Sequence, residues 1–163
     1  MSSGVKKTNA MRMLDSAKIP YEVRTYEFEE TDLAGVHAAD AVGMPYETVF
    51  KTLVARGDKT GFVVFCIPVA EELDLKKAAR ASKNKSVELL HVKDLLPTTG
   101  YIRGGCSPLA AKKAYPVLID QSAATHERIY VSAGLRGVQI QLGPNDLLRA
   151  TQGAYAPLTR SAD

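Results

Sequence analysis

Alternating and apolar stretches along the chain predict several short β-strands. Residues 21–26 alternate between polar and apolar side chains, which is typical of a strand with one buried face. Residues 62–67 (FVVFCI) are all apolar, so they predict a strand buried on both faces. The turn at 56–61 joins this run to residues 49–55, and the two runs predict a β-hairpin. Further strands are predicted at 101–103, 116–120, 128–132 and 138–142, the last two joined by the turn 133–137.

Helices are predicted between these strands. Residues 7–18 carry small and apolar side chains at helical spacing and predict a first helix. Residues 36–42 predict a short helix that Gly43 closes. Further helices or helical turns are predicted at 73–81, 92–96, 109–114 and 145–151. Because strands and helices are interspersed without a repeat or a long linker, we expect a mixed sheet in a single α+β or α/β domain over residues 1–163.

The composition fits an ordinary globular domain. A chain of 163 residues with 45% hydrophobic and 24% charged residues can bury a core without disulfides or metals. The longest apolar run is far shorter than the roughly 18 residues of a membrane span, and the start of the chain lacks the apolar core of a secretory signal. With only Cys66 and Cys106 present, we expect a reduced, cytoplasmic protein.

The net charge of +3 conceals an uneven distribution of charged residues. Residues 1–50 contain five Lys/Arg and eight Asp/Glu, residues 51–113 contain twelve and six, and residues 114–163 contain four of each. The middle segment therefore has a net charge of +6. This excess indicates a polyanionic partner such as a nucleic acid, although lysine-rich helix faces are often only solvated.

Lys51 is the most informative single residue because it interrupts an apolar strand. Burying an ammonium group is unfavourable unless it meets an anion, water or a cavity. One interpretation is an edge-strand lysine whose ammonium group reaches solvent. The other places Lys51 at the mouth of a pocket, where Thr52 adds a hydroxyl and a backbone N–H.

A glycine-rich loop, GGCSP at 104–108, follows a predicted strand. Gly104 and Gly105 allow the backbone to approach a ligand closely, and the N–H groups of such a loop can hold a carbonyl oxygen or a phosphate. The loop matches neither the P-loop nor the dinucleotide-binding pattern, so a tight strand-to-helix turn explains it equally well.

Other candidate chemistry is weaker. Cys106 could act as a nucleophile at a helix N-terminus, but no histidine lies near it in sequence to serve as its base. The two cysteines and three scattered histidines have no zinc-ligand spacing, so we expect no metal and no cofactor. Tyr26, at the end of its strand, could line a pocket or cover the edge of the core.

Five segments taken together resemble the YbaK family of trans-editing aminoacyl-tRNA deacylases, which is related to the editing domain of bacterial prolyl-tRNA synthetase. Each segment is weak evidence alone, but their order and spacing match over residues 8–150. The segments are VFKTL at 49–53, IPVA with LDLKK at 67–77, TGYIRGGCSP at 99–108, VLID at 117–120 and IYVSAGLRG at 129–137.

The resemblance implies a single α+β domain with a mixed, partly barrel-like sheet surrounded by helices. It implies hydrolysis of Cys-tRNA(Pro), with the acceptor end of the mischarged tRNA as partner and a ternary complex with prolyl-tRNA synthetase. Lys51 matches the family's essential lysine. The other matching positions are Tyr26, Thr52, Gly104, Gly105, Ser107, Asp120 and Arg136, the last two without an assigned role. No membrane association is implied.

Two positions depart from the family pattern. Gln139 stands where the family has an aspartate, and Ala34 lies near the position of a pocket phenylalanine. These departures leave the amino-acid preference open between Cys-tRNA(Pro) and another mischarged tRNA such as Ala-tRNA(Pro). A non-catalytic module that binds tRNA or a synthetase is the alternative from a different class.

The family-level mechanism needs no nucleophile from the protein. The thiol of the substrate cysteine attacks its own ester and expels the tRNA. Backbone N–H groups near Gly104 and Gly105 would hold the oxyanion, and Lys51 would hold the terminal phosphate of the acceptor end. Cys106 occupies a slot that is aliphatic in the family, which argues against a nucleophilic role.

Overall fold

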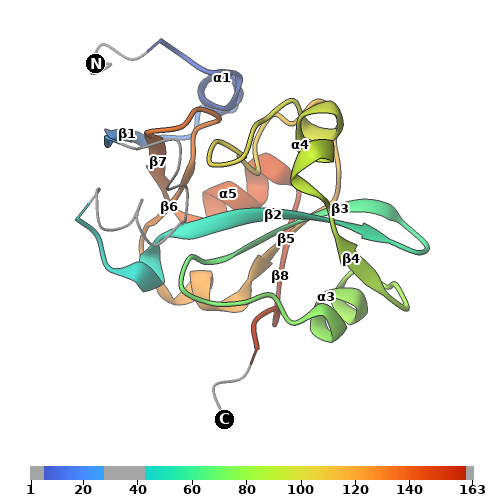
Figure 1. Cartoon of the computed structure of the whole chain (residues 1–163). Helices are drawn as coiled ribbons and strands as arrows, with labels where there is room; N and C mark the ends of the chain where they lie inside the picture. Colours follow the sequence, from blue (N-terminus) through green and yellow to red (C-terminus); the bar gives the residue numbers. More distant parts are fainter. Residues whose placement is uncertain (1–5, 28–42, 161–163) are drawn as a thin grey trace.

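The computed structural model describes residues 6–27 and 43–160, which form two β-sheets with helices packed around them (Figure 1). No helix in these residues is both long and apolar enough to cross a membrane. The strands are β1 Glu22–Thr25, β2 Phe50–Gly57, β3 Gly61–Pro68, β4 Val87–Leu89, β5 Val117–Asp120, β6 Ile129–Ser132, β7 Val138–Leu142 and β8 Ala154–Ala156. The helices are α1 Asn9–Ser16, α3 Leu75–Ala81, α4 Val92–Thr99 and α5 Pro144–Thr151, with short 3₁₀ turns η1 Tyr46–Thr48 and η2 Gln121–Thr125.

The larger sheet is mixed and has the strand order β4-β2-β3-β5-β8. β2 pairs antiparallel with β3 and β4, whereas β5 runs parallel to both β3 and β8. The smaller sheet, β1-β7-β6, is antiparallel. A parallel bridge between Val49 and Tyr130 connects the two sheets, which do not close into a barrel within the described residues. The α+β class and the mixed sheet predicted from the sequence are confirmed.

Strand β3 is buried on both faces, as its apolar sequence predicts. Val64 and Cys66 pack into the main core, which α1, α5 and the smaller sheet help to build. Val63, Phe65 and Ile67 point to the opposite face and pack beneath α3. Because both faces are covered, a polar residue in the paired strand β2 must either lie near an open edge or serve a site.

The strand predicted at 101–103 is wrong, because local hydrogen bonds take up its backbone groups. The N–H of Tyr101 donates to Thr99 Oγ1 at 3.0 Å, and the carbonyl of Ile102 accepts the N–H of Gly105. Gly100 and Gly104 both have positive φ angles, which turn the chain instead of extending it. The segment is an irregular loop.

The helical turn predicted at 109–114 is also wrong. Ala110 has a φ of 54°, in the left-handed region, and this conformation interrupts a right-handed helix. The N–H of Leu109 instead donates to Ser107 Oγ at 3.2 Å. The segment therefore consists of turns and does not form a helix.

The remaining helices and strands lie close to their predicted positions, with a few exceptions. Helix α4 continues past its predicted end at residue 96 to Thr99, with Pro97 inside it. Strands β4 and β8 have three residues each, too few for an alternating pattern to be visible, and they were not predicted. The helix predicted at 36–42 lies outside the described residues.

Asn84 fixes the β2–β3 turn, so we expect Asn84→Ala to destabilise the fold. Its Oδ1 accepts the N–H groups of Lys59 and Thr60 at 2.9 and 3.0 Å, and its Nδ2 donates to the hydroxyls of Thr60 and Ser82. Loss of these buried bonds should cost about 2–3 kcal/mol in a urea unfolding titration. Asn145→Ala, which removes one exposed bond, is the control. Equal losses in both variants would contradict the role of Asn84.

Candidate functional site

A row of polar residues crosses three strands on one face of the molecule. Because β2 and β6 run parallel from the Val49–Tyr130 bridge, Lys51 and Ser132 occupy equivalent positions two residues further along. Ser132 is in turn the register partner of Gln139 on β7. Cross-strand partners point to the same face of a sheet, so Lys51, Ser132 and Gln139 share one face across both sheets. We call these three residues the polar row.

Tyr26 lies one step along β1 from Arg24, the residue beside the outer end of the polar row. Its N–H donates to the carbonyl of Gly137 at 2.9 Å, which continues the β1–β7 ladder by one residue. Side chains alternate along a strand, so Tyr26 lies on the same face as Arg24, the register partner of Gln139. The structure therefore brings Tyr26, Lys51 and Gln139 to one face, although they are far apart in sequence.

Lys51 is half-buried, and this burial lowers the pKa of its ammonium group below the ordinary 10.5. Glu72 and, to a smaller extent, Glu71 oppose the shift because their negative charges favour the protonated form. A partly desolvated cation interacts with an anion more strongly than an exposed one does. Lys51 is thus suited to hold a negatively charged group of a ligand.

The glycine loop packs against the turn between β6 and β7. A Cβ atom on Gly105 would lie 3.2 Å from the nitrogen of Arg136, and one on Gly134 would lie 2.9 Å from the ring of Tyr101. Arg136 also donates from Nε to the carbonyl of Arg103 at 2.7 Å. These contacts fix the loop beside the strand ends that carry Ser132 and Gln139.

The two loop glycines differ in what their backbones can offer a ligand. The N–H of Gly105 donates to the carbonyl of Ile102 at 3.0 Å and is therefore used within the loop. In the described part of the chain, the N–H of Gly104 has no such acceptor. Gly104, with a φ of 86°, is thus the loop glycine that can donate to a bound carbonyl oxygen or phosphate.

The side chain of Thr52 lies on the other face of the sheet from Lys51. Its Oγ1 is 4.0 Å from Sγ of Cys66, its register partner on β3. Burial raises the pKa of Cys66 and of Cys106 to about 12 each. Both thiols are therefore protonated at neutral pH, which makes them poor nucleophiles.

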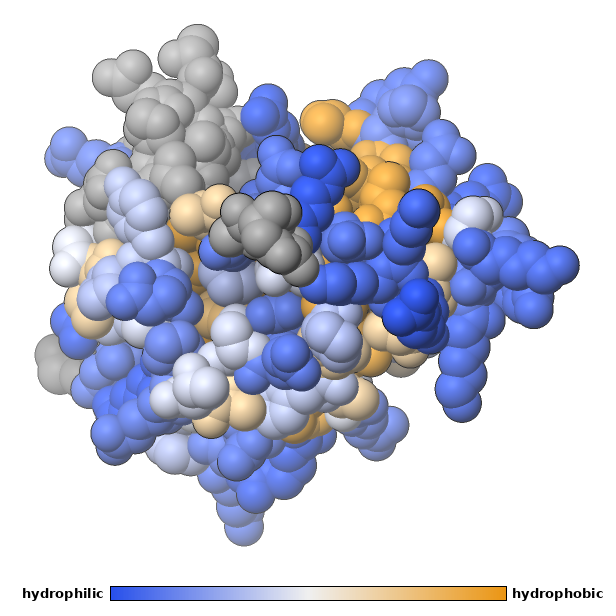
Figure 2. Space-filling model, turned by 90° about the horizontal axis from the view of Figure 1, so that it is seen from below, coloured by the Kyte–Doolittle hydropathy of each residue, from blue (hydrophilic) through white to orange (hydrophobic). Residues whose placement is uncertain are grey.

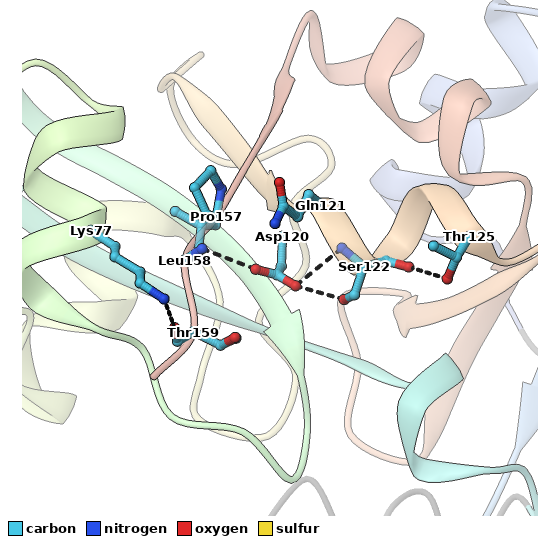
Figure 3. Close-up of a pocket in the computed structure, with 8 residues that line it drawn as sticks. All are labelled: Lys77, Asp120, Gln121, Ser122, Thr125, Pro157, Leu158 and Thr159. Atoms are coloured by element: carbon cyan, nitrogen blue, oxygen red, sulfur yellow. Dashed lines mark hydrogen bonds between the residues drawn. The ribbon is translucent and has the colours of Figure 1, made fainter. Parts of the chain in front are cut away.

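Ser107 and Asp120 have structural partners in this fold. Ser107 is buried and accepts the N–H of Leu109. Asp120 accepts from the N–H and hydroxyl of Ser122 and from the N–H of Leu158, so it ties η2 to the C-terminal segment. It lines an open groove of about 510 Å³ (Figure 3), whose other residues are Lys77, Gln121, Ser122, Thr125, Pro157, Leu158 and Thr159. Lys51 does not line this groove.

Ser132 was not among the residues singled out from the sequence. Its Oγ accepts the N–H of Gly134 at 3.2 Å, and its hydroxyl hydrogen can still be donated to a ligand. The strand segment IYVS alternates only weakly, so nothing marks this serine without the pairing of β6 with β2 and β7. The register of the sheets is what reveals it.

Comparison with known proteins finds a family match over most of the chain and a close curated relative. The family model for the aminoacyl-tRNA editing domain matches residues 30–150. A curated relative from Enterococcus faecalis (strain ATCC 700802 / V583), "Putative Cys-tRNA(Pro)/Cys-tRNA(Cys) deacylase EbsC", is 49% identical over 154 residues, which cover 94% of each chain.

Two solved structures share the fold at lower identity. One, described as a "putative trans-editing enzyme for prolyl tRNA synthetase", has a TM-score of 0.78 and 21% identity, and the match covers 96% of this chain and 100% of that one. The other, the "hypothetical protein APE2540", has a TM-score of 0.84 and 18% identity, with 94% and 100% covered. At these identities the likeness supports the fold alone.

The pKa of Lys51 can be tested by chemical labelling. In a competitive acetylation series followed by mass spectrometry, we expect Lys51 to lose its proton with a midpoint below pH 10.5. Glu72→Gln should lower the midpoint further, because a charge that favours the ammonium form is removed. Glu88→Gln, on β4, is the control and should leave it in place. A midpoint at or above 10.5 would contradict the desolvation of Lys51.

Proposed function

Because the chain belongs to the aminoacyl-tRNA editing domain family, we propose that it removes cysteine from mischarged Cys-tRNA(Pro) in trans. The observation that carries the proposal is the polar row of Lys51, Ser132 and Gln139, together with the glycine loop that packs on the β6–β7 turn. A desolvated cation and an oriented N–H group are what an aminoacyl ester with an adjacent phosphate requires. The deacylase name of the 49%-identical relative supports this substrate class.

In the proposed reaction the protein positions the substrate and stabilises charge. The substrate thiol forms a bond from its sulfur to the ester carbonyl carbon, and the bond from that carbon to the ribose oxygen breaks. The thiol proton ends on the released ribose hydroxyl, and water then opens the cyclic thioester. The N–H of Gly104 would hold the oxyanion, while Lys51 would hold the terminal phosphate.

The raised pKa values of the protein's thiols support this substrate-assisted mechanism. Cys106 lies in the glycine loop and is the protein thiol best placed to compete with the substrate thiol. Its pKa of about 12 leaves almost no thiolate at neutral pH. This argues against a cysteine nucleophile of the protein and favours attack by the substrate thiol or by water.

The expected partners follow from the substrate. Prolyl-tRNA synthetase mischarges cysteine because a pocket cannot strongly reject a side chain close to proline in size. We propose that the protein acts with that synthetase in a ternary complex with tRNA. Because charged tRNAs are its substrates, we expect it in the cytoplasm.

A deacylation assay with a panel of mischarged tRNAs tests the proposal. Cys-tRNA(Pro) should be deacylated fastest, and Lys51→Ala should lose at least about 99% of kcat/KM, or roughly 3 kcal/mol of transition-state stabilisation. Removing a half-buried ammonium relieves a desolvation cost, so this variant should keep its fold by circular dichroism. Cys106→Ser should remain active, and EDTA should have no effect.

Each other outcome has a definite meaning. Equal rates for Cys-tRNA(Pro) and Ala-tRNA(Pro) would indicate that an activated water attacks the ester in place of the substrate thiol. Binding of tRNA without deacylation of any substrate would indicate a non-catalytic module. Wild-type turnover by a folded Lys51→Ala protein would show that Lys51 is not part of the active site.

The basic residues of the middle segment, taken with Arg136 of the β6–β7 turn, fall into two groups. Arg103 and Lys112 flank the glycine loop, where the N–H of Lys112 donates to the carbonyl of Thr99. This loop and the β6–β7 turn belong to the segments 95–119 and 128–145, which contain no aspartate or glutamate. We define Arg103, Lys112, Lys113 and Arg136 as the basic rim. The absence of acidic residues from these two segments favours contact of the basic rim with the phosphates of the acceptor end.

The lysines around α3 have a different setting. Lys77 donates to the carbonyl of Thr159 at 2.8 Å, and the acidic residues Glu71, Glu72 and Asp74 precede or begin the helix. Seen from below (Figure 2), hydrophilic side chains cover most of the surface, and the most strongly hydrophobic residues gather in one area. We therefore expect the α3 lysines to be solvated, while the basic rim carries the tRNA contacts.

Salt dependence of tRNA binding distinguishes the two groups. Affinity for uncharged tRNA should fall steeply with salt, and Arg103→Glu/Lys112→Glu should flatten the log–log slope by roughly 0.7–0.9 for each phosphate that is no longer bound. Lys76→Glu/Lys83→Glu, with the same change in net charge, should leave the slope unchanged. A slope that changes only in the Lys76→Glu/Lys83→Glu variant would indicate that the tRNA binds at α3.

A further inference from the structure

Two large apolar side chains are exposed beside the proposed site. Ile102, two residues before Gly104, is 45% exposed, and Leu135, in the β6–β7 turn, is 46% exposed. A single exposed apolar residue is ordinary on a protein surface, whereas apolar residues that gather within a polar rim mark a contact site. The question is therefore whether these two residues lie together.

The packing of the glycine loop on the β6–β7 turn brings them together. The ring of Tyr101 comes within 2.9 Å of the position that a Cβ atom on Gly134 would take, and Cα of Leu135 lies 3.5 Å from the Cβ position of Gly105. Figure 1 shows the yellow loop beside the orange turn. Because Ile102 follows Tyr101 and Leu135 follows Gly134, the two apolar residues are neighbours across this contact.

Each of the two apolar residues is followed by an arginine, and the two arginines are linked. Nε of Arg136 donates to the carbonyl of Arg103 at 2.7 Å. The segments 95–119 and 128–145, which contain both pairs, have no aspartate or glutamate. An apolar side chain beside an arginine, repeated on two touching turns, suits an unpaired nucleotide, because its base has a flat apolar face and its phosphate is negatively charged.

The pair lies close to the N–H group that would hold the ester carbonyl. Ile102 and Gly104 are two residues apart, so their Cα atoms are separated by at most about 7 Å. In an aminoacyl-tRNA, one ribose ring separates the ester from the base of the same nucleotide. A carbonyl oxygen bound at the Gly104 N–H therefore leaves that base within reach of Ile102 and Leu135.

We propose that Ile102 and Leu135 form a platform for the base of the 3′-terminal nucleotide, the one that carries the amino acid. This proposal rests on the proposed function and concerns the nucleotide side of the substrate. The two aliphatic side chains cover one face of the base, and the arginines that follow them lie beside the phosphate backbone. Every base has such a face, so the platform recognises an unpaired 3′ end and does not read its sequence.

The test compares Cys-tRNA(Pro) with an abasic form of the same substrate, in which hydrogen replaces the base of the 3′-terminal nucleotide and the cysteinyl ester is kept. The wild type should prefer the intact substrate about tenfold in kcat/KM, because the abasic form cannot contact the platform. Ile102→Ser/Leu135→Ser should bring the two values close together. A variant that is merely damaged would slow both substrates equally and keep the preference.

Leu89→Ser is the matched control. Leu89 is 43% exposed, almost the same fraction as Leu135, but it lies on β4, outside the glycine loop and the β6–β7 turn. This variant should keep the wild-type preference for the intact substrate. Because substitutions at exposed positions change stability little, both variants should melt close to the wild type. Should the double variant fail to fold, the two substrates still test the platform in the wild-type protein.

Equal kcat/KM values of the wild type for the intact and abasic substrates would overturn the platform and leave the deacylase intact. An unchanged preference in the folded double variant would overturn it as well. If that variant also bound prolyl-tRNA synthetase more weakly, the apolar pair would belong to a protein interface instead. No deacylation of any substrate by the wild type would overturn the proposed function, so the two failures are distinguishable.

Discussion

The site depends on the bridge between Val49 and Tyr130, because it joins the two sheets in a fixed register. Both side chains are buried, and they pack together with Val69. From this contact the parallel course of β2 and β6 sets Lys51 opposite Ser132, and the β6–β7 ladder adds Gln139. A one-residue slip at the bridge would turn the lysine away from the polar residues of the smaller sheet.

The second constraint is the close packing of the glycine loop on the β6–β7 turn. Gly105 and Gly134 have no room for a Cβ atom without displacing Arg136 or Tyr101. The loop can therefore be held near the polar row without a helix or strand of its own. This rigidity suits a site that works by positioning a substrate, since a preorganised donor needs no rearrangement during the reaction.

Much of the fold could be predicted from the sequence, because burial leaves a clear periodic signal. The β2–β3 hairpin and its buried second strand follow from apolar runs, and Lys51 is conspicuous because it breaks one of them. The loop at 104–108 was predicted, but its extension over 101–103 and 109–114 was not, since it follows from turns at Gly100, Gly104 and Ala110 and from a side-chain bond of Thr99. Short strands such as β4 form through tertiary pairing and leave no pattern.

For the site itself, the sequence indicates residue types, and the sheet register decides which of them meet. Lys51, Tyr26 and Gln139 come together on one face, whereas Thr52 faces Cys66 on the other. Asp120 is engaged by Ser122 and Leu158 at a separate groove. Ser132 emerges only from pairing that connects residues distant in sequence.

The most direct test is a crystal structure with a non-hydrolysable analogue, cysteine joined by an amide to 3′-amino-3′-deoxyadenosine. The account predicts that the carbonyl oxygen of the analogue lies within hydrogen-bond distance of the Gly104 N–H. An analogue bound instead in the groove beside Asp120, with the polar row unoccupied, would contradict the account.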